Sequence, residues 1–271
     1  MSIISIACAA PRLPESSVLK LLTDIWRERG IESVTGTAYA PQADACILHI
    51  DRTRLAANDV PTPHRDIRPI NGDVLDISKR LFSVLEVRPG SDWDGEVIVK
   101  TNLNHFGLPE YRSTPSLSNR LRRRAAGVSW RMARTLPDRT YPVLPSIRRV
   151  PGWVWDNPDY IVEKFMPERE GELYCLRGWM FLGNAGYGWR LFSTDPLVKT
   201  GTMVGHEFLT EVPDELVELR KKSNFDFGKF DYVMHHGKPI LLDMNKTPAY
   251  SGDRSSPRLR KLAGGIEEFL P

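Results

Sequence analysis

Three oxygen-bearing side chains near the end of the chain, Asp231, Asp243 and Asn245, have types and a spacing that could hold a metal ion. They fall in two runs of strand-forming residues, which are predicted to form a hairpin that turns at residues 235–237. Carboxylate and amide oxygens, with no cysteine beside them and no histidine at ligand spacing, favour Mg²⁺ completed by water and phosphate oxygens. The hairpin therefore predicts a magnesium site. The alternative is a surface hairpin whose aspartates face solvent.

The facing of these predicted ligands follows from the two-residue period of a strand. Asp243 and Asn245 share one face, whereas Leu242 and Met244 are expected to point into the core. Asp231 lies on the same face of the hairpin as Asp243 and Asn245 only if the turn has the right length. A three-residue turn would place Asp231 diagonal to Asp243, and a two-residue turn would break the site.

A lysine at the end of a strand is a candidate for binding phosphate. Lys100 ends a strand-like run at residues 96–100, where it would offer a fixed positive charge to a nucleotide. The polar loop that follows contains Asn102 and ends at Gly107, and its backbone amides could close over the same phosphates. A solvated surface charge is the alternative for Lys100.

The elements that would position these residues alternate between strand and helix, which is typical of an α/β fold. The opening of the chain is predicted as strand, helix, strand and strand, at residues 3–9, 15–29, 32–38 and 45–49. Prolines then mark a loop, and residues 74–84 have helical spacing. Later strands are predicted at 96–100, 160–165, 173–181 and 186–192, a helix at 214–223, and the closing hairpin at 230–245.

The segment 116–155 is basic and has no clear counterpart in this pattern. Residues 116–135 have a helical composition with six arginines, and prolines make the stretch up to residue 160 extended or looped. Two explanations stay open. The helix binds an acidic substrate, a carrier or nucleic acid, or it presents a solvated face.

The composition is that of a globular chain with one or two cores. Of the 271 residues, 41% are hydrophobic and 26% are charged, and the net charge of +3 is too balanced for a dedicated nucleic-acid binder. No apolar stretch approaches the roughly 20 residues of a membrane helix. Cys8, Cys46 and Cys175 lie in apolar runs, which indicates buried reduced thiols. Because no secretory signal is evident, a cytoplasmic location is expected.

The order of these motifs resembles that of the ATP-grasp enzymes. Asp231, followed by the segment 240–248 with its acidic-x-Asn strand and proline, is similar to the closing signature of that family. The segment 160–166 resembles the family's hinge strand, which borders the adenine. The resemblance runs in order from Lys79 to Pro248.

The resemblance implies three sets of site residues. The residues implied to contact ATP are Lys79 and Lys100 at the phosphates, Asn102 in the loop, Glu163, Lys164, Phe165 and Met166 at the hinge, and Glu170 at the ribose. Two Mg²⁺ ions, with Mn²⁺ as a substitute, would be held by Asp231, Asp243 and Asn245. Arg177, Arg190 and Lys199 are expected to point into the same cleft, toward a γ-phosphate or an acyl-phosphate, and the alternative for each is a strand-edge charge in water.

The architecture that the resemblance implies has three parts. An N-terminal α/β lobe at residues 1–78 precedes a two-part ATP-grasp fold, with a small subdomain at 79–159 and a large subdomain at 160–271. ATP would lie between two β-rich layers.

The activity that the resemblance implies is that of an ADP-forming ligase. A substrate carboxylate would attack the γ-phosphate of ATP, and an amine, or less often a thiol, would capture the acyl-phosphate. The expected partners are small-molecule or peptide carboxylates and amines, and neither a membrane nor nucleic acid is expected. A small-molecule kinase and an inactive nucleotide-binding partner subunit are the alternatives.

Overall fold

The N-terminal part of the protein is a parallel three-stranded sheet covered by one helix. The structure, a computed structural model, describes residues 1–113 and 116–271. The sheet has the order β2-β1-β3 and consists of β1 (Ile3–Cys8), β2 (Glu32–Gly36) and β3 (Ala45–His49). Helix α1 (Val18–Glu28) connects β1 to β2, and the hydroxyl of Ser17 caps it by accepting a hydrogen bond from the Leu19 amide. The predicted strand, helix, strand and strand are confirmed.

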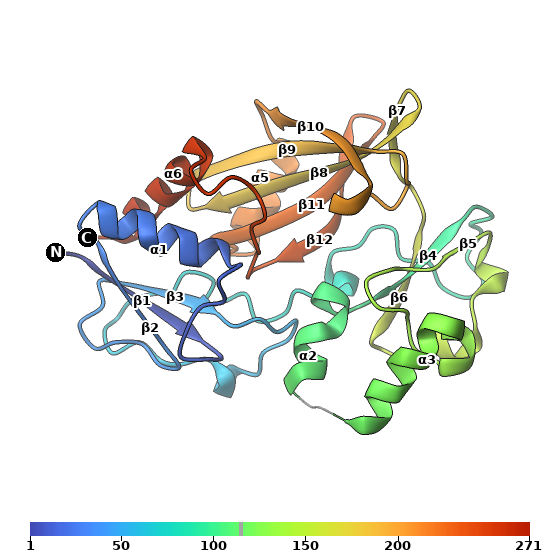
Figure 1. The fold of residues 1–271 in the computed structure, drawn as a ribbon, viewed down its shortest axis with the longest axis horizontal. Helices are drawn as coiled ribbons and strands as arrows, with labels where there is room; N and C mark the ends of the chain where they lie inside the picture. Colours follow the sequence, from blue (N-terminus) through green and yellow to red (C-terminus); the bar gives the residue numbers. More distant parts are fainter. Residues whose placement is uncertain (114–115) are drawn as a thin grey trace.

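A six-stranded antiparallel sheet occupies the second half of the chain (Figure 1). Its strands are β7 (Glu168–Glu170), β8 (Leu173–Leu182), β9 (Ala185–Ser193), β10 (Met203–Leu209), β11 (Phe227–His235) and β12 (Lys238–Asn245). The order is β10-β9-β8-β11-β12, with β7 paired to β8. The sequence did not predict β7 or β10. The first is very short, and the second is largely exposed, so no alternation of apolar residues marks it.

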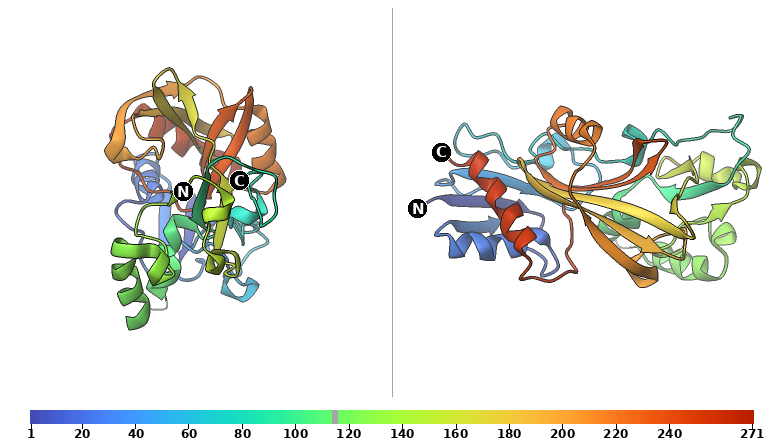
Figure 2. Two further views of the ribbon diagram at one scale, coloured as in Figure 1. Left: turned by 90° about the vertical axis from the view of Figure 1, so that its right-hand side faces the viewer. Right: turned by 90° about the horizontal axis from the view of Figure 1, so that it is seen from above.

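A smaller antiparallel sheet lies at the end of the molecule that is far from the two termini (Figure 2). It has the order β5-β4-β6 and consists of β4 (Val97–Thr101), β5 (Val143–Leu144) and β6 (Tyr160–Lys164). Every residue of β6 pairs with a residue of β4. The chain therefore returns to this sheet after residues 102–159, most of which lie outside it. The predicted division of the chain at residues 78 and 159 stays a prediction.

The remaining elements are short helices. The α-helices are α2 (Leu108–Ser113), α3 (Leu117–Ala133), α4 (Gly152–Trp155), α5 (Asp214–Lys222) and α6 (Pro257–Gly264). The 3₁₀ turns are η1 (Ala57–Asp59), η2 (Lys79–Leu81), η3 (Asn104–Gly107), η4 (Ile147–Arg149), η5 (Thr200–Thr202) and η6 (Gly265–Phe269). The predicted helices at 116–135 and 214–223 are confirmed as α3 and α5, and α3 is kinked at Ser129.

Three clusters of buried side chains join these layers. The first lies between the N-terminal sheet, α1, α6 and one face of the six-stranded sheet, where the indole of Trp26 donates a hydrogen bond to the carbonyl of Ala263. The second fills the other face of that sheet beneath α5, around Phe181 and Phe230. The third lies in the β5-β4-β6 sheet and includes Val99. Helices packed on separate sheets confirm the predicted α/β class.

Residues 74–84 do not form the helix that their spacing predicted. Val74 and Ile77 are buried against the six-stranded sheet, as an apolar pair at helical spacing would be. The backbone, however, bonds to a distant loop, because the Ile77 amide donates to the carbonyl of Thr53 at 3.0 Å. Only the turn η2 remains helical, and it places Lys79 at its first position.

Two simpler expectations can be compared with the structure. None of the helices in residues 1–113 and 116–271 has both the length and the apolar character needed to cross a bilayer. Cys8, Cys46 and Cys175 are buried and free, as their apolar surroundings in the sequence predicted.

Candidate functional site

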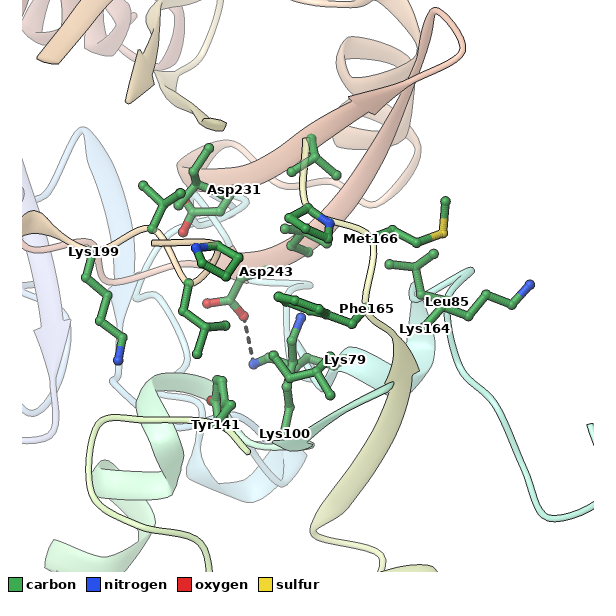
Figure 3. A pocket seen from close by; sticks show the side chains of 18 of the residues that line it. Lys79, Leu85, Lys100, Tyr141, Lys164, Phe165, Met166, Lys199, Asp231 and Asp243 are labelled. Atoms are coloured by element: carbon green, nitrogen blue, oxygen red, sulfur yellow. Dashed lines mark ion pairs between the residues drawn. The ribbon is translucent and has the colours of Figure 1, made fainter. Parts of the chain in front are cut away.

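A cavity of about 280 Å³ lies between the β5-β4-β6 sheet and the β11–β12 end of the six-stranded sheet (Figure 3). Its charged and polar lining residues are Lys79, Lys100, His105, Tyr141, Lys164, Lys199, Asp231 and Asp243. Its apolar lining includes Leu85, Ile98, Phe165, Met166, Val233 and Leu242. In Figure 3, Leu85 and Met166 lie at one side of the cavity and Lys199 at the other. The cavity therefore offers both an apolar wall and a group of charges.

The two predicted metal-binding aspartates face each other across the β11–β12 hairpin. Asp231 and Asp243 are direct partners in the strand register. The turn has two residues, His236 and Gly237, with positive φ angles of 50° and 76°, as a type I′ turn requires. The predicted three-residue turn is therefore wrong. A β-bulge that leaves Leu242 without a partner restores the facing that the shorter turn alone would have lost.

The bulge changes the surroundings of the residues beside Asp243. Leu242 lines the cavity rather than pointing into the core as predicted, because the bulge turns it out of the regular alternation. Met244 is buried beneath α5, as predicted. Asn245 pairs in register with Lys229 and does not line the cavity, and its side-chain oxygen accepts a hydrogen bond from the Thr247 amide at 2.9 Å.

Each of the two aspartates is held by a lysine. Nζ of Lys79 lies 2.8 Å from Oδ1 of Asp243, and Nζ of Lys229 lies 2.7 Å from Oδ2 of Asp231 (Figure 3 shows the first pair). Burial lowers the pKa of Lys79, but the attraction of Asp243 outweighs it, so the net pKa is raised. Burial raises the pKa of Asp231 more than Lys229 lowers it. The cluster is thus compact and close to neutral.

A third ion pair joins the adjacent strands β4 and β6 of the smaller sheet. Nζ of Lys100 lies 2.6 Å from Oε2 of Glu163, whose side chain is only 1% exposed. The adjacent Lys164 lies on the opposite face of β6, and its ammonium group lies 5.1 Å from the ring centre of Trp93. Figure 3 shows that its side chain extends away from the other lysines. Lys100 therefore faces the cavity with a buried counter-charge behind it.

The segment after β6 forms the apolar wall of the cavity. Phe165 and Met166 line it, together with Pro167. The carbonyl of Met166 lies 2.8 Å from Nε2 of His235, which ties this crossing segment to the end of β11. The predicted hinge strand therefore connects the two sheets at the cavity.

Three residues that were predicted to bind ATP, Asn102, Glu163 and Glu170, lie outside the cavity lining. The side chain of Asn102 is buried, accepts a hydrogen bond from the Arg80 amide at 2.9 Å and donates one to the carbonyl of Pro158 at 3.1 Å. It fixes the turn that presents Lys79. Glu170 lies on β7, exposed, and forms an ion pair with Arg190. The structure thus does not bring the side chain of Asn102 or Glu170 to the other predicted ligands.

Of the three predicted catalytic cations, the structure brings only Lys199 to the cavity. Arg177 pairs in register with Tyr232, a residue of the core beneath α5, so its side chain leaves the sheet on the face away from Asp231. It binds both oxygens of Glu168, with Nη2 2.7 Å from Oε1. Arg190 pairs with Glu170 and Glu207. Arg190, on β9, is the direct register partner of Arg177 and so lies on the same face of the sheet. The expectation that these arginines point into the cleft is wrong, because it assigned no face to β8 or β9.

The sequence did not single out three features of the cavity. Lys229 stands two residues before Asp231 on the same strand, and this spacing was a usable signal. Tyr141 stacks on Phe106 at 4.5 Å between ring centres and comes from a proline-rich segment without a motif. His105 and Phe106 both have positive φ, a conformation that non-glycine residues rarely adopt and that no local pattern announced.

Comparison with known proteins supports the fold and leaves the chemistry open. No family model matches the sequence, and none of the curated proteins does. Among solved structures, the chain is similar to a RimK domain ATP-grasp protein from Sphaerobacter thermophilus DSM 20745, with a TM-score of 0.52 and 14% identity over 99% of both chains. It is also similar to the macrocyclase MdnC bound with precursor peptide MdnA from Microcystis aeruginosa MRC, with a TM-score of 0.50 and 9% identity over 100% of this chain and 99% of that chain.

The chain therefore has the ATP-grasp fold, as its closing motif predicted.

Proposed function

We propose that the cavity binds ATP, with the adenine against Phe165 and Met166 and the phosphates near Lys79 and Lys100. The observation that carries this proposal is the arrangement of charges. Two buried lysines line one side of the cavity, Lys79 paired with Asp243 and Lys100 with Glu163, and the two aspartates line the other side, next to an apolar wall. Fixed cations of this kind stabilise phosphate groups without a reorganisation cost.

The hairpin residues fit a divalent cation. Asp231 and Asp243 offer hard carboxylate oxygens at directly paired positions, and Asn245 adds an amide oxygen on the same strand. The contact of Lys79 is to Oδ1 of Asp243 and that of Lys229 is to Oδ2 of Asp231. We propose that these residues hold two Mg²⁺ ions, or Mn²⁺ in their place. Bound Mg²⁺ would supply charge neutralisation for the phosphates.

The proposed reaction is the ADP-forming ligation of a carboxylate to an amine. A substrate carboxylate is already an anion at neutral pH, so it needs no general base to attack the γ-phosphorus. The bond between that phosphorus and the bridging oxygen breaks, and ADP leaves. An amine, or less often a thiol, then attacks the acyl carbon and releases phosphate. The carboxylate and the amine belong to small molecules or peptides.

The lysines would act by position and charge. Transfer of Lys79 from Asp243 to a phosphate oxygen exchanges one buried anionic partner for another. Lys199 lies on the 196–199 segment at the cavity edge, where its ammonium lies 3.2 Å from the hydroxyl of Thr140. From there it can reach a γ-phosphate or an acyl-phosphate. The three free thiols are consistent with the proposed cytoplasmic location.

Coupled measurement of ADP release tests the reaction. Purified protein is given Mg²⁺-ATP with pools of amino acids, short peptides and other small carboxylates, each with and without added amines. Release of ADP that requires both a carboxylate and an amine is the expected result. The double variant Asp243→Ala and Asn245→Ala should release none, whereas the exposed control Asp253→Ala should retain full release.

The same assay separates the alternatives. ADP release with a hydroxyl compound alone, together with a phosphorylated product, identifies a kinase. Binding of ATP without any ADP release across the pools supports an inactive partner subunit. Either result overturns the ligase assignment but leaves the nucleotide site in place.

A further inference from the structure

Helix α3 has two apolar faces, and only one of them is packed. On the inner face, Ala126 is 3% exposed and the guanidinium of Arg123 lies 4.5 Å from the ring centre of Tyr111. Beyond the kink, the indole of Trp130 packs edge-on against Trp153 in the core of the smaller sheet. This face holds the helix on the molecule.

The opposite face of α3 is apolar and open to solvent. At 100° per residue, positions 117, 121, 125 and 128 fall within an arc of about 80°. Leu117 is 78% exposed, Leu121 65% and Val128 94%, and Ala125 is also exposed. Met132, after the kink, is 86% exposed. Single exposed apolar side chains are ordinary, but a continuous stripe of them along one helix marks an interaction surface.

The helix and the segments that flank it carry a strong and largely uncompensated positive charge. Residues 112–149 contain ten arginines and one aspartate, a net charge of +9, so the rest of the chain carries −6. Arg123 pairs with Asp138. Arg120, Arg122 and Arg124, which flank the apolar stripe, form no ion pair with a carboxylate in the part of the chain that the structure describes. The surface thus combines apolar anchors with unpaired cations.

A hollow of about 460 Å³ lies beside the start of the stripe, between α2 and α3. Its lining includes Leu117, Arg120, Arg123 and Tyr111. Tyr111 and Arg123 also line a small hollow that reaches Phe106, and Phe106 lines the nucleotide cavity. The hollow between α2 and α3 and the cavity are therefore each next to this small hollow, with which they share lining residues.

We propose that the open face of α3 is a docking surface for an acidic, amphipathic peptide segment. Leucine-like side chains of the peptide pack on Leu121 and Val128 and enter the hollow beside Leu117, and its carboxylates pair with Arg120, Arg122 and Arg124. A second copy of this chain is a poorer occupant, because two-fold pairing would bring two surfaces of +9 together. Nucleic acid is disfavoured by the absence of an aromatic side chain among the stripe residues.

A bilayer is also a poorer fit than a peptide. A flat surface would touch the ridge formed by the stripe but would leave the hollow beside Leu117 unfilled, whereas a peptide side chain can enter it. This inference concerns binding alone and does not depend on the proposed ligation, so each can fail without the other.

Fluorescence anisotropy with synthetic peptides tests the docking surface. The probe is a labelled peptide of about 15 residues, long enough to sample a helix, with leucines every three to four positions among glutamates and aspartates. A control peptide replaces the acidic residues with lysine. The acidic peptide should bind saturably. Its affinity should fall as the NaCl concentration is raised from about 0.05 to about 0.5 M, because salt screens the charge of the arginines. The lysine peptide should not bind.

Variants place the binding on α3. The double variant Leu121→Asp and Val128→Asp should lower the affinity for the acidic peptide by at least roughly tenfold. The triple variant Arg120→Ala, Arg122→Ala and Arg124→Ala should lower it by a similar factor. The matched control Val204→Asp changes an apolar residue of similar exposure on β10 and should bind like the wild type. Circular dichroism checks that each variant is folded, which is expected because all of these side chains are exposed.

Several outcomes would overturn the proposal. These are no binding of the acidic peptide, equal binding by the α3 variants, or equal binding of both peptides. Binding to vesicles of phosphatidylserine without binding of the peptide would assign the surface to a membrane. A concentration-dependent dimer that the aspartate variants abolish, again without peptide binding, would assign it to a second copy of the chain.

Discussion

The cavity between the two antiparallel sheets and the open face of α3 are both rich in charged residues, but they differ in how these residues are paired. Lys79 and Lys100, which line the cavity, and Lys229, which contacts the lining residue Asp231, each have a carboxylate within 2.8 Å. On α3, Arg120, Arg122 and Arg124 have no such partner in the described part of the chain. Breaking a buried pair leaves a charge in a poorly solvated place, whereas a surface arginine is already solvated. The cavity charges should therefore contribute to both stability and ligand binding, and the α3 charges to binding alone.

Removal of Lys79 should give the largest effect. Lys79→Met should weaken Mg²⁺-ATP binding by roughly hundredfold, because a charge-assisted contact to phosphate is lost. It should also lower the free energy of unfolding by about 2 kcal/mol, since Asp243 loses its ion-pair partner. Calorimetry and urea unfolding measure the two quantities. An unchanged ATP affinity in a folded variant would place the phosphates elsewhere.

Removal of Lys100 should lower stability as well as weaken ATP binding, because Lys100 is a proposed phosphate ligand and the partner of a buried carboxylate. Lys100→Met leaves Glu163, which is 1% exposed, without its cation and should lower the free energy of unfolding by about 3 kcal/mol. Adding Glu163→Gln should recover much of the loss, because the buried charge is then gone. The matched α3 change, Arg124→Met, should cost less than about 0.5 kcal/mol. If urea unfolding shows that Lys100→Met and Arg124→Met lower the free energy of unfolding equally, the proposed contrast between the two regions is wrong.

Arg177 should behave as a structural residue despite its original assignment to catalysis. Its bidentate contact with Glu168 is half-buried, so Arg177→Met should lower the free energy of unfolding by about 2 kcal/mol. Because it lies on the face of the sheet away from Asp231, ATP affinity should stay within about twofold of the wild type. A tenfold loss of ATP affinity in calorimetry would show that the arginine reaches the nucleotide after all.

His49 offers a smaller test, since it is a buried titratable group without a charge partner among the described residues. Burial lowers its pKa from 6.5 to about 4. Between those values the unfolded chain binds more protons than the folded one, so stability is lost as the pH falls from 6.5 toward 4. From pH 7 to 5.5 the loss should be about 1 kcal/mol.

Thermal unfolding of His49→Gln against wild type isolates this contribution. The variant keeps a polar group opposite Ser17, whose hydroxyl lies 3.2 Å from Nε2 of His49, but cannot titrate. The difference in stability between the two proteins should therefore narrow or reverse as the pH falls. Parallel pH profiles would mean that another group causes the acid sensitivity.

The sequence predicted which residues line the cavity better than it predicted how their side chains are arranged. Lys79, Lys100, Phe165, Met166, Asp231 and Asp243 all line it. Types and order along the chain were sufficient to find them. Lys100, Asp231 and Asp243 lie on strands with a local pattern, and Phe165 and Met166 directly follow one. The identity of the fold followed from the same order of motifs.

The face on which each strand side chain lies and the strand register could not be predicted. Both depend on strand pairs between residues that are far apart in the sequence. A two-residue turn and a bulge at Leu242 compensate for each other, and neither has an unambiguous signal in the sequence. Arg177 was placed in the cleft because the sequence does not say that it pairs with Tyr232. Residues 74–84 have helical spacing, but a bond from Ile77 to Thr53 decides their conformation.

The most direct test of the account is a calorimetric titration with ATP, with and without Mg²⁺, of wild type and of the double variant Asp243→Ala and Asn245→Ala. The wild type should bind ATP in a Mg²⁺-dependent manner, and the folded variant should lose that dependence and most of its affinity. If the wild type does not bind ATP, or if the folded variant binds Mg²⁺-ATP equally well, the assignment of the cavity to a magnesium nucleotide is contradicted.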